Sequence, residues 1–271
     1  MTDGQELREA PVSAALTTRW LGRAYRYAAE LDSTNDQMKR WAAGGAPHGA
    51  VLLADYQSAG RGRLDRRWDA PPATSLLLSV LLRPSGWPAE RGAWLTMLAG
   101  LAAAEAVEAS AKLPARLKWP NDVLIEHEGA WRKAGGLLLD AALDGERLAT
   151  AILGIGLNVN IPADALPSFA TPATSLLAAG GQSVSRRALL VALLARLEAH
   201  YLAADAGQSP AAAWSARLIT LGQAVTVSAA GSAAPLWGVA EGVDEWGRLL
   251  VRDAAGQAHT IAAGDVTLRA R

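Results

Sequence analysis

The chain has 271 residues, and 51% of them are hydrophobic, which is enough for one large domain plus a small one. Basic and acidic residues number 26 each, so there is no global basic field to attract nucleic acid, and anion recognition must be local. Cysteine is absent, which excludes disulfides, thiolate metal sites and a cysteine nucleophile. The first residues do not resemble a signal peptide, and no apolar run is long enough to span a bilayer. We therefore expect a soluble cytoplasmic protein.

The first half of the chain predicts short elements of both kinds. Residues 1–18 show no clear hydrophobic period and are expected to form an N-terminal arm or a peripheral helix. A helix is predicted over residues 34–43, capped by Ser33 or Thr34. Residues 75–82 form an almost continuous apolar run of strand length, and a long helix is predicted from Pro88 to about residue 110.

The second half predicts strands, then helices, then strands again. Turn signals separate four strand candidates, which indicates an antiparallel meander: residues 116–119, 123–126, 136–143 and 148–158. Helices are predicted over residues 186–203 and 210–218. From residue 222 short strand candidates alternate with glycine and aspartate turns, which is typical of a small all-β barrel. We predict an arm (1–18), a large α+β domain (19–221) and a β-barrel domain (222–271).

An arginine-rich segment follows the apolar strand candidate at residues 50–54. Residues 57–68 read Gln-Ser-Ala-Gly-Arg-Gly-Arg-Leu-Asp-Arg-Arg-Trp and contain four arginines. Glycine lets backbone N–H groups approach a ligand, and arginine presents a planar fork of donors that suits phosphate and carboxylate oxygens. Taken alone, such a segment is more often a solvated surface loop than an anion site, so its interpretation depends on the rest of the chain.

Four further segments place polar or glycine-rich residues between apolar runs. They are Asp-Ser-Thr-Asn at 32–35, Lys-Trp-Pro-Asn-Asp at 118–122, Lys-Ala-Gly-Gly at 133–136 and Gly-Ile-Gly-Leu-Asn-Val-Asn at 154–160. In this order and spacing, the five segments resemble the catalytic domain of the biotin protein ligases. The resemblance implies an α+β fold with a mixed, largely antiparallel sheet flanked by helices, of the class II aminoacyl-tRNA synthetase and biotin ligase type. It also implies an SH3-like β-barrel at the C-terminus.

The resemblance implies a two-step reaction. Biotin and ATP give biotinyl-5′-AMP and pyrophosphate, and biotin then passes to a lysine of the carrier domain of a biotin-dependent carboxylase. The first step brings a carboxylate against a phosphate, a repulsion of about 4 kcal/mol at about 4 Å and an effective dielectric constant near 20. The catalytic residues implied are Lys133 and Arg63, which would cancel this repulsion, together with Asp122 near the acyl-adenylate. Mg²⁺ would arrive with ATP near Asp122, without dedicated protein ligands.

The resemblance also implies two overlapping sets of binding residues. Ser33, Thr34 and Gln57 offer the hydroxyl and amide groups that a buried ureido ring needs, because each missing hydrogen bond costs about 1–3 kcal/mol. The biotin-binding set is Ser33, Thr34, Asn35, Gln57, Gly60, Arg61, Gly62, Arg63, Trp68, Lys133, Gly135 and Gly136. The ATP-binding set is Arg63, Arg66, Trp68, Lys118, Asn121, Asp122, Lys133 and Asn158, with Asn158 matched to the residue that contacts adenine.

Each segment also has a structural interpretation. Ser33 and Thr34 could be helix caps with no other role, and residues 120–122 could be a simple hairpin turn. Lys133 could be a surface lysine at a strand end. The chain departs from the family pattern at Asp65, where glycine is usual. We expect this carboxylate to alter loop ordering or adenylate retention while activity is kept.

Three other functions compete with a biotin ligase. A lipoate ligase-like acyl transferase would share the fold, but its pocket would not need the polar set at residues 33, 34 and 57. A biotin-sensing repressor would add an N-terminal DNA-binding module, for which about 30 residues before Asp32 leave no room. An interaction module that has lost its catalytic centre is not supported, because no motif is missing. We expect no nucleic-acid or membrane partner, and a homodimer is a further hypothesis.

Overall fold

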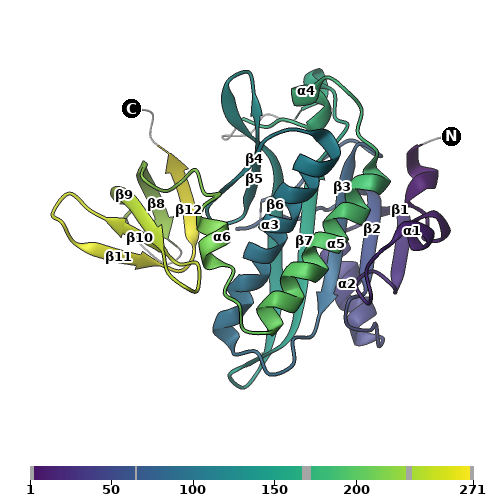
Figure 1. Ribbon diagram of the computed structural model, residues 1–271, viewed down its shortest axis with the longest axis horizontal. Helices are drawn as coiled ribbons and strands as arrows, with labels where there is room; N and C mark the ends of the chain where they lie inside the picture. The colour runs from purple at the N-terminus through teal and green to yellow at the C-terminus, as the bar shows by residue number, and fades with distance from the viewer. Residues whose placement is uncertain (1–2, 65, 167–171, 230–233, 269–271) are drawn as a thin grey trace.

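The computed structural model describes residues 3–64, 66–166, 172–229 and 234–268 (Figure 1). The expectation for Asp65 therefore falls outside the described residues. The helices are η1 (Asp3–Leu7), α1 (Glu9–Ala15), α2 (Thr34–Ala43), η2 (Ala89–Arg91), α3 (Gly92–Ala111), η3 (Ala163–Ala165), α4 (Leu176–Gly180), α5 (Arg186–Asp205) and α6 (Ala211–Ser215).

Seven strands form one mixed sheet in the order β1-β2-β3-β7-β6-β5-β4. β1 pairs in parallel with β2 and every other ladder is antiparallel, so the predicted fold class is confirmed. Their bounds are β1 (Tyr25–Leu31), β2 (Val51–Gln57), β3 (Ser75–Leu82), β4 (Ala115–Lys118), β5 (Asp122–His127), β6 (Ala130–Asp144) and β7 (Arg147–Asn158).

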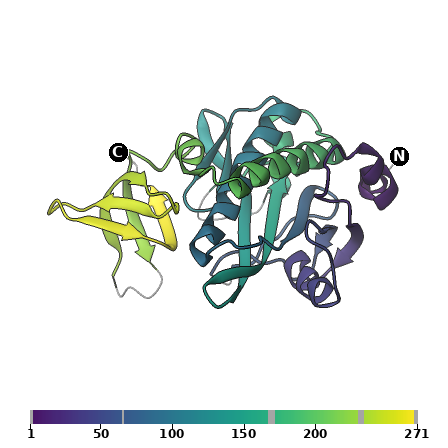
Figure 2. The same ribbon diagram turned by 60° about the horizontal axis from the view of Figure 1, so that its bottom comes forward.

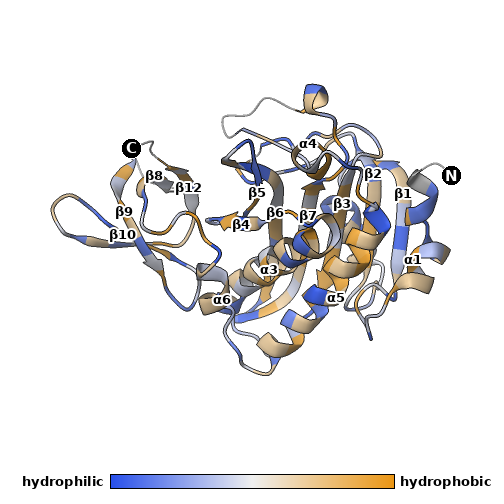
Figure 3. Ribbon diagram, turned by 45° about the horizontal axis from the view of Figure 1, so that its top comes forward, coloured by the Kyte–Doolittle hydropathy of each residue, from blue (hydrophilic) through white to orange (hydrophobic). Residues whose placement is uncertain are grey.

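Helices α3 and α5 cover one face of this sheet (Figures 1 and 2). Both present the apolar residues that the sequence pattern predicted, and Leu95, Leu98, Leu189 and Leu193 are buried. In Figure 3 the hydrophobic colour is concentrated on strands of the sheet and on the helices that cover it. The smaller α2 packs on the opposite face through Met38. None of the described helices is long and apolar enough to cross a membrane.

Several predicted boundaries need correction. β6 begins at Ala130, so Lys133 lies inside a strand and not at its entrance. The predicted helix over residues 210–218 is only α6, because the chain then joins the edge of the sheet through Leu218, which bridges Leu117 of β4. Tertiary pairing decides both boundaries, and hydrophobic periodicity carries no information about such pairing.

The C-terminal residues form a second, five-stranded antiparallel sheet in the order β11-β10-β9-β8-β12. The sequence predicted a small all-β barrel here, and the all-β character is confirmed. Among the described residues no ladder joins β11 to β12, so the sheet is not closed. Edge pairing is a long-range contact that turn spacing alone does not specify. Its strands are β8 (Ala224–Ala229), β9 (Leu236–Val243), β10 (Leu249–Arg252), β11 (Ala258–Ile261) and β12 (Gly264–Leu268).

The turn between β9 and β10 fixes this sheet beside the large one. The indole Nε1 of Trp94 donates to the carbonyl of Glu245 at 2.9 Å, and that of Trp119 donates to the carbonyl of Gly247 at 2.9 Å. The rings of Trp94 and Trp246 also stack, with centroids 6.0 Å apart. β12 is thereby held at the opening of the cavity described next.

Candidate active site

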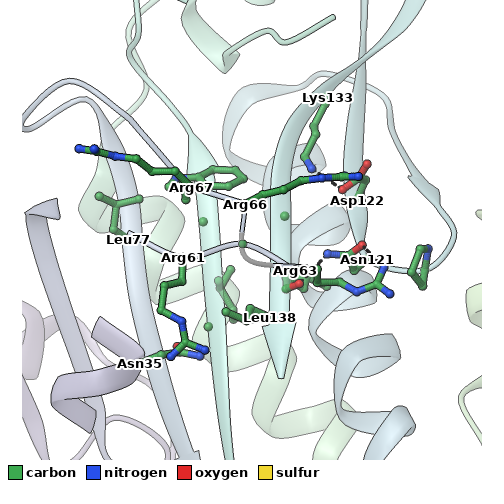
Figure 4. A pocket seen from close by; sticks show the side chains of 18 of the residues that line it. Asn35, Arg61, Arg63, Arg66, Arg67, Leu77, Asn121, Asp122, Lys133 and Leu138 are labelled. Atoms are coloured by element: carbon green, nitrogen blue, oxygen red, sulfur yellow. Dashed lines mark hydrogen bonds and ion pairs between the residues drawn. The ribbon is translucent and has the colours of Figure 1, made fainter. Parts of the chain in front are cut away.

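A cavity of about 630 Å³ lies between the large sheet and β12, on the sheet face opposite α3 and α5 (Figure 4). This volume is within the usual range for small-molecule sites. The cavity gathers most of the residues predicted from the sequence: Ser33, Thr34, Asn35, Gln57, Arg61, Gly62, Arg63, Arg66, Trp68, Lys118, Asn121, Asp122, Lys133 and Gly136.

Three predicted residues do not line this cavity. Gly60 supports the fold of the loop, since a Cβ there would collide with the carbonyl oxygen of Trp68. Gly135 faces the other side of the sheet, where a Cβ would lie 2.5 Å from Cδ2 of Leu157. Asn158 is buried and donates through Nδ2 to the carbonyl of Thr174 at 3.0 Å. Its contact with adenine therefore stays a prediction.

The described part of the arginine-rich segment, residues 57–64 and 66–68, which we call the arginine loop, folds back as a short hairpin. The backbone N–H of Trp68 donates to the carbonyl of Gly60 at 2.9 Å, and that of Gly62 donates to the carbonyl of Arg66 at 2.7 Å. An isolated bridge pairs Arg61 with Arg67. This hairpin lays Trp68 across the sheet and directs its arginines to different sides of the cavity (Figure 4).

Trp68 rests on two glycines that the strand register places opposite each other, Gly136 of β6 and Gly156 of β7. A Cβ at Gly156 would lie 2.8 Å from Cε2 of Trp68, and one at Gly136 would lie 2.9 Å from its Cζ3. Only glycine leaves this space for the ring. The indole Nε1 is buried and has no hydrogen-bond partner among the described residues.

One end of the cavity is buried and carries neutral polar groups. Ser33 caps α2, because its Oγ accepts from the backbone N–H of Asp36. The backbone N–H and the hydroxyl of Thr34 both donate to Oε1 of Gln57, at 2.7 and 2.9 Å. Oδ1 of Asn35 accepts from a buried hydroxyl on β3 at 2.5 Å. The structural and functional interpretations of Ser33 and Thr34 are therefore compatible, since capping leaves them in the cavity wall.

The other end of the cavity is strongly charged. Nζ of Lys133 lies 2.5 Å from Oδ1 of Asp122. Arg63 donates through Nη1 to Oδ1 of Asn121 at 3.2 Å and through Nη2 to the carbonyl of Gly264 in β12 at 3.2 Å. In Figure 4 the side chains of Arg63 and Asn121 point toward each other, below Lys133 and Asp122.

Lys118 and Arg66 complete this charged end. Arg66 pairs with Asp265 of β12. Burial lowers the pKa of Lys118, while the carboxylate of Asp122 raises it. The nearby positive charges of Lys133 and Arg66 lower the pKa of Lys118 further.

Burial also lowers the pKa of Arg63, while the carboxylate of Asp122 raises it. A guanidinium keeps its charge in proteins. In this region of the cavity four cationic side chains face two carboxylates, Asp122 and Asp265. The charged end is therefore suited to an anion such as a phosphate or a carboxylate.

Sequence reasoning missed the contribution of the C-terminal sheet. Asp265, Val266 and Thr267 line the cavity from β12. No local pattern marks them, because they become neighbours of the arginine loop only when β12 pairs with β8. The aliphatic wall was also missed, since Leu77 and Leu138 look like ordinary core residues in an apolar strand.

Comparisons with known proteins identify the family of the chain. Residues 27–158 match the biotin/lipoate A/B protein ligase family, and residues 220–269 match the biotin protein ligase C-terminal domain. The chain is 35% identical to a biotin--[acetyl-CoA-carboxylase] ligase of Mycobacterium tuberculosis over 98% of each chain. It is 34% identical to the ligase of that name from Paracoccus denitrificans, over 88% of this chain and 98% of that one.

Two further comparisons define the extent of the likeness. The chain is 33% identical to the bifunctional ligase/repressor BirA of Bacillus spizizenii over 72% of its own length, and the match spans 59% of that relative. Among solved structures, it resembles the biotin protein ligase of Aquifex aeolicus in complex with biotin and ATP. The TM-score is 0.73 at 28% identity, and the match covers 91% of this chain and 99% of that chain.

Proposed function

The chain belongs to the biotin protein ligase family, and from this premise we propose how its cavity activates biotin with ATP and passes it to a carrier lysine. As a family member it is an ATP-dependent ligase that uses biotin. One observation supports the proposed arrangement above all others. A single cavity, which Trp68 also lines, joins a buried, neutral polar end to a cationic end.

The neutral end suits the ureido ring of biotin. Thr34 and Gln57 present hydroxyl and amide groups that are already oriented by their mutual hydrogen bonds. The ring would find both donors and acceptors there without leaving a buried polar group unpaired. Trp68 and the aliphatic wall would cover the valeryl chain. Bound in this way, biotin would direct its carboxylate toward Lys133.

The cationic end suits the reacting groups of the first step. In that step a carboxylate oxygen of biotin forms a bond to the α-phosphorus of ATP, and pyrophosphate leaves. Lys133 would reduce the repulsion between the two anions, and Arg63 would hold the phosphate and retain the adenylate. Lys118, Asn121 and Arg66 would bind the remaining phosphate oxygens. Mg²⁺ would enter with ATP, and Asp122 is the carboxylate that could meet it.

In the second step the amine of the carrier lysine attacks the acyl carbon of biotinyl-5′-AMP, forms the amide and releases AMP. Asp122 is a candidate for orienting that amine, since its carboxylate lies beside Lys133 at the charged end. The acceptor we propose is the biotin carboxyl carrier domain of a biotin-dependent carboxylase.

We also propose a catalytic domain at residues 19–221 and a C-terminal domain at residues 222–271. A cytoplasmic location and a homodimer remain hypotheses, the latter testable by sedimentation with and without biotin and ATP.

Exchange of labelled pyrophosphate into ATP tests the first step. The purified protein is assayed with biotin, lipoate, octanoate or no acid. Exchange that requires biotin is expected, because the polar end offers hydrogen bonds that an aliphatic acid cannot use. Exchange with lipoate alone would contradict the proposal and favour the lipoate ligase-like alternative. Incorporation of biotin into a purified carrier domain, abolished when its acceptor lysine is replaced by arginine, tests the second step.

A further inference from the structure

Four charged side chains form a closed group beside the neutral end of the cavity, which we call the Asp140 cluster: Asp36, Lys39, Arg61 and Asp140. Asp36 lies 2.5 Å from Nη1 of Arg61 and 3.4 Å from Nζ of Lys39. Asp140 lies 2.7 Å from Nζ of Lys39 and 3.5 Å from Nη2 of Arg61. Each cation therefore contacts both carboxylates, and the charges of the cluster balance.

The Asp140 cluster joins three separate elements. Asp36 and Lys39 lie on α2, Asp140 lies on β6, and Arg61 belongs to the arginine loop. Figure 4 shows the guanidinium of Arg61 directed toward Asn35, away from Lys133. The side chain of Arg61 therefore anchors the loop to the wall of the cavity and is not directed at the charged end.

Asp140 has a second contact that reaches the cavity. One of its carboxylate oxygens accepts from Nδ2 of Asn35 at 3.3 Å, while Oδ1 of Asn35 accepts from Oγ of Ser79 at 2.5 Å. A Cβ at Gly154 would lie 2.5 Å from that Oδ1, so the amide is closely packed. Asn35 and Arg61 line the cavity, whereas Asp140 does not. Asp140 thus touches two lining residues from behind.

We propose that Asp140 is a positioning residue for biotin, an inference that rests on the proposed function. It orders the arginine loop through Arg61 and orients the amide of Asn35. The loop backbone at Gly60 then stays against Gln57, where a Cβ would lie 3.0 Å from Nε2 of Gln57. A loop that is already ordered loses less conformational entropy when biotin binds. The contribution of Asp140 therefore appears in the affinity for biotin and in the retention of biotinyl-5′-AMP, and not in the rate of the chemical step.

The size of the effect follows from the exposure of the cluster. The side chain of Asp140 is 21% exposed and that of Arg61 is 40% exposed, so each single ion pair is partly screened. Loss of the carboxylate of Asp140 weakens two ion pairs and one hydrogen bond at the same time. We expect the Kd for biotin to rise about fivefold, which is about 1 kcal/mol at 1.4 kcal/mol per factor of ten.

Asp140→Asn tests the proposal, because it removes the charge with little change in volume. Biotin binding is measured by calorimetry, and pyrophosphate exchange is measured at saturating biotin. We expect the fivefold loss of affinity and faster release of biotinyl-5′-AMP, with kcat within about twofold of the unsubstituted protein. Asp140→Glu should recover part of the affinity. The control is Asp144→Asn, an exposed carboxylate about 13 Å further along the same strand, which should change nothing.

Two further measurements separate positioning from a structural role. The difference in Kd between Asp140→Asn and the unsubstituted protein should shrink as salt is raised, since it arises from partly exposed charges. The single variant Arg61→Gln should bind biotin more weakly than the unsubstituted protein. In the double variant, Asp140→Asn should raise the Kd for biotin by a smaller factor than it does alone. Unchanged affinity in a folded Asp140→Asn protein, or losses that simply add, would overturn the inference. Failure of the unsubstituted protein to bind biotin would instead overturn the proposed function.

Discussion

Nζ of Lys133 lies 2.5 Å from Oδ1 of Asp122, across the neighbouring strands β6 and β5. The two side chains are 25% and 15% exposed, so the pair is mostly covered by the cavity wall. A carboxylate thus holds the ammonium at the charged end before any substrate arrives. In the reaction that we propose, this carboxylate would hold the partly covered ammonium in position for the two anionic reactants.

Replacement of Lys133 by alanine should lower the rate of adenylation by roughly a thousandfold, if its charge offsets a repulsion of about 4 kcal/mol. The protein should still fold, since only one partly covered ion pair is lost. Pyrophosphate exchange at saturating biotin measures the rate, and circular dichroism on heating measures the fold. Lys112→Gln, at an exposed helix end, is the control and should keep full activity. An unfolded Lys133→Ala protein would show that the lysine is structural.

Gly156→Ala should weaken the binding of biotin and ATP without unfolding the chain. Its Cβ would lie 2.8 Å from Trp68, so the indole could no longer rest on the sheet. We expect about a tenfold rise in KM, because an overpacked contact costs about 1–3 kcal/mol. The double variant with Trp68→Ala relieves the collision and should bind no worse than Trp68→Ala alone.

Two other glycines serve as comparisons for this prediction. Gly44→Ala adds a Cβ at ordinary contact distance, 3.5 Å from a backbone oxygen, and should be neutral. Gly135→Ala directs its Cβ into the core, so it should lower the melting temperature more than Gly156→Ala does. If Gly156→Ala unfolds the protein as readily as Gly135→Ala does, the weaker binding of Gly156→Ala would result from damage to the sheet and not from a change in the arginine loop.

The affinity for ATP should fall at alkaline pH because of Lys118. Burial lowers the pKa of Lys118 below the ordinary value of about 10.4, and ATP binds the charged form better. As pH rises through this lowered pKa, the ammonium loses its proton and KM for ATP should increase. Lys118→Arg keeps its charge and should move the increase to higher pH. Identical pH profiles of KM for the two proteins would rule out Lys118 as the titrating group.

Glu198 should contribute stability that disappears in acid. Its carboxylate accepts from the backbone N–H groups of Arg19, Trp20 and Leu21 at 2.7, 3.0 and 2.9 Å. Although burial raises the pKa of Glu198, these hydrogen bonds lower it more, so the net shift is downward. The stabilisation is therefore present above the ordinary value of about 4.3 and is lost as pH falls through the lowered pKa.

Replacement of Glu198 by alanine should cost about 3 kcal/mol at neutral pH, because three backbone donors, one of them buried, lose their acceptor. Chemical denaturation at pH 7 and again below pH 4 measures the difference in the free energy of unfolding. The difference between the two proteins should narrow in acid. A difference that stays constant with pH would show that packing, and not the charge of Glu198, stabilises this corner of the molecule.

Much of the candidate site could be predicted from the sequence, because its residues occur in short segments with their own chemical character. Ser33 and Thr34 stand at a helix start, and Lys118 to Asp122 surround a turn between strands. Helix starts and turns depend on neighbours within a few residues, so composition alone indicates them. The five segments together were also specific enough to indicate the family, which the comparisons confirm.

The tertiary structure decided which of these side chains meet. Arg61 and Asp140 are 79 residues apart, and Arg66 and Asp265 are 199 apart. Strand register placed Gly136 opposite Gly156 beneath Trp68, and it turned Gly135 into the core. A shift of one residue would have exchanged those two glycines, and no local pattern fixes such a register. The sequence by itself determined the chemistry that the cavity contains, while long-range strand pairing determined how that chemistry is arranged.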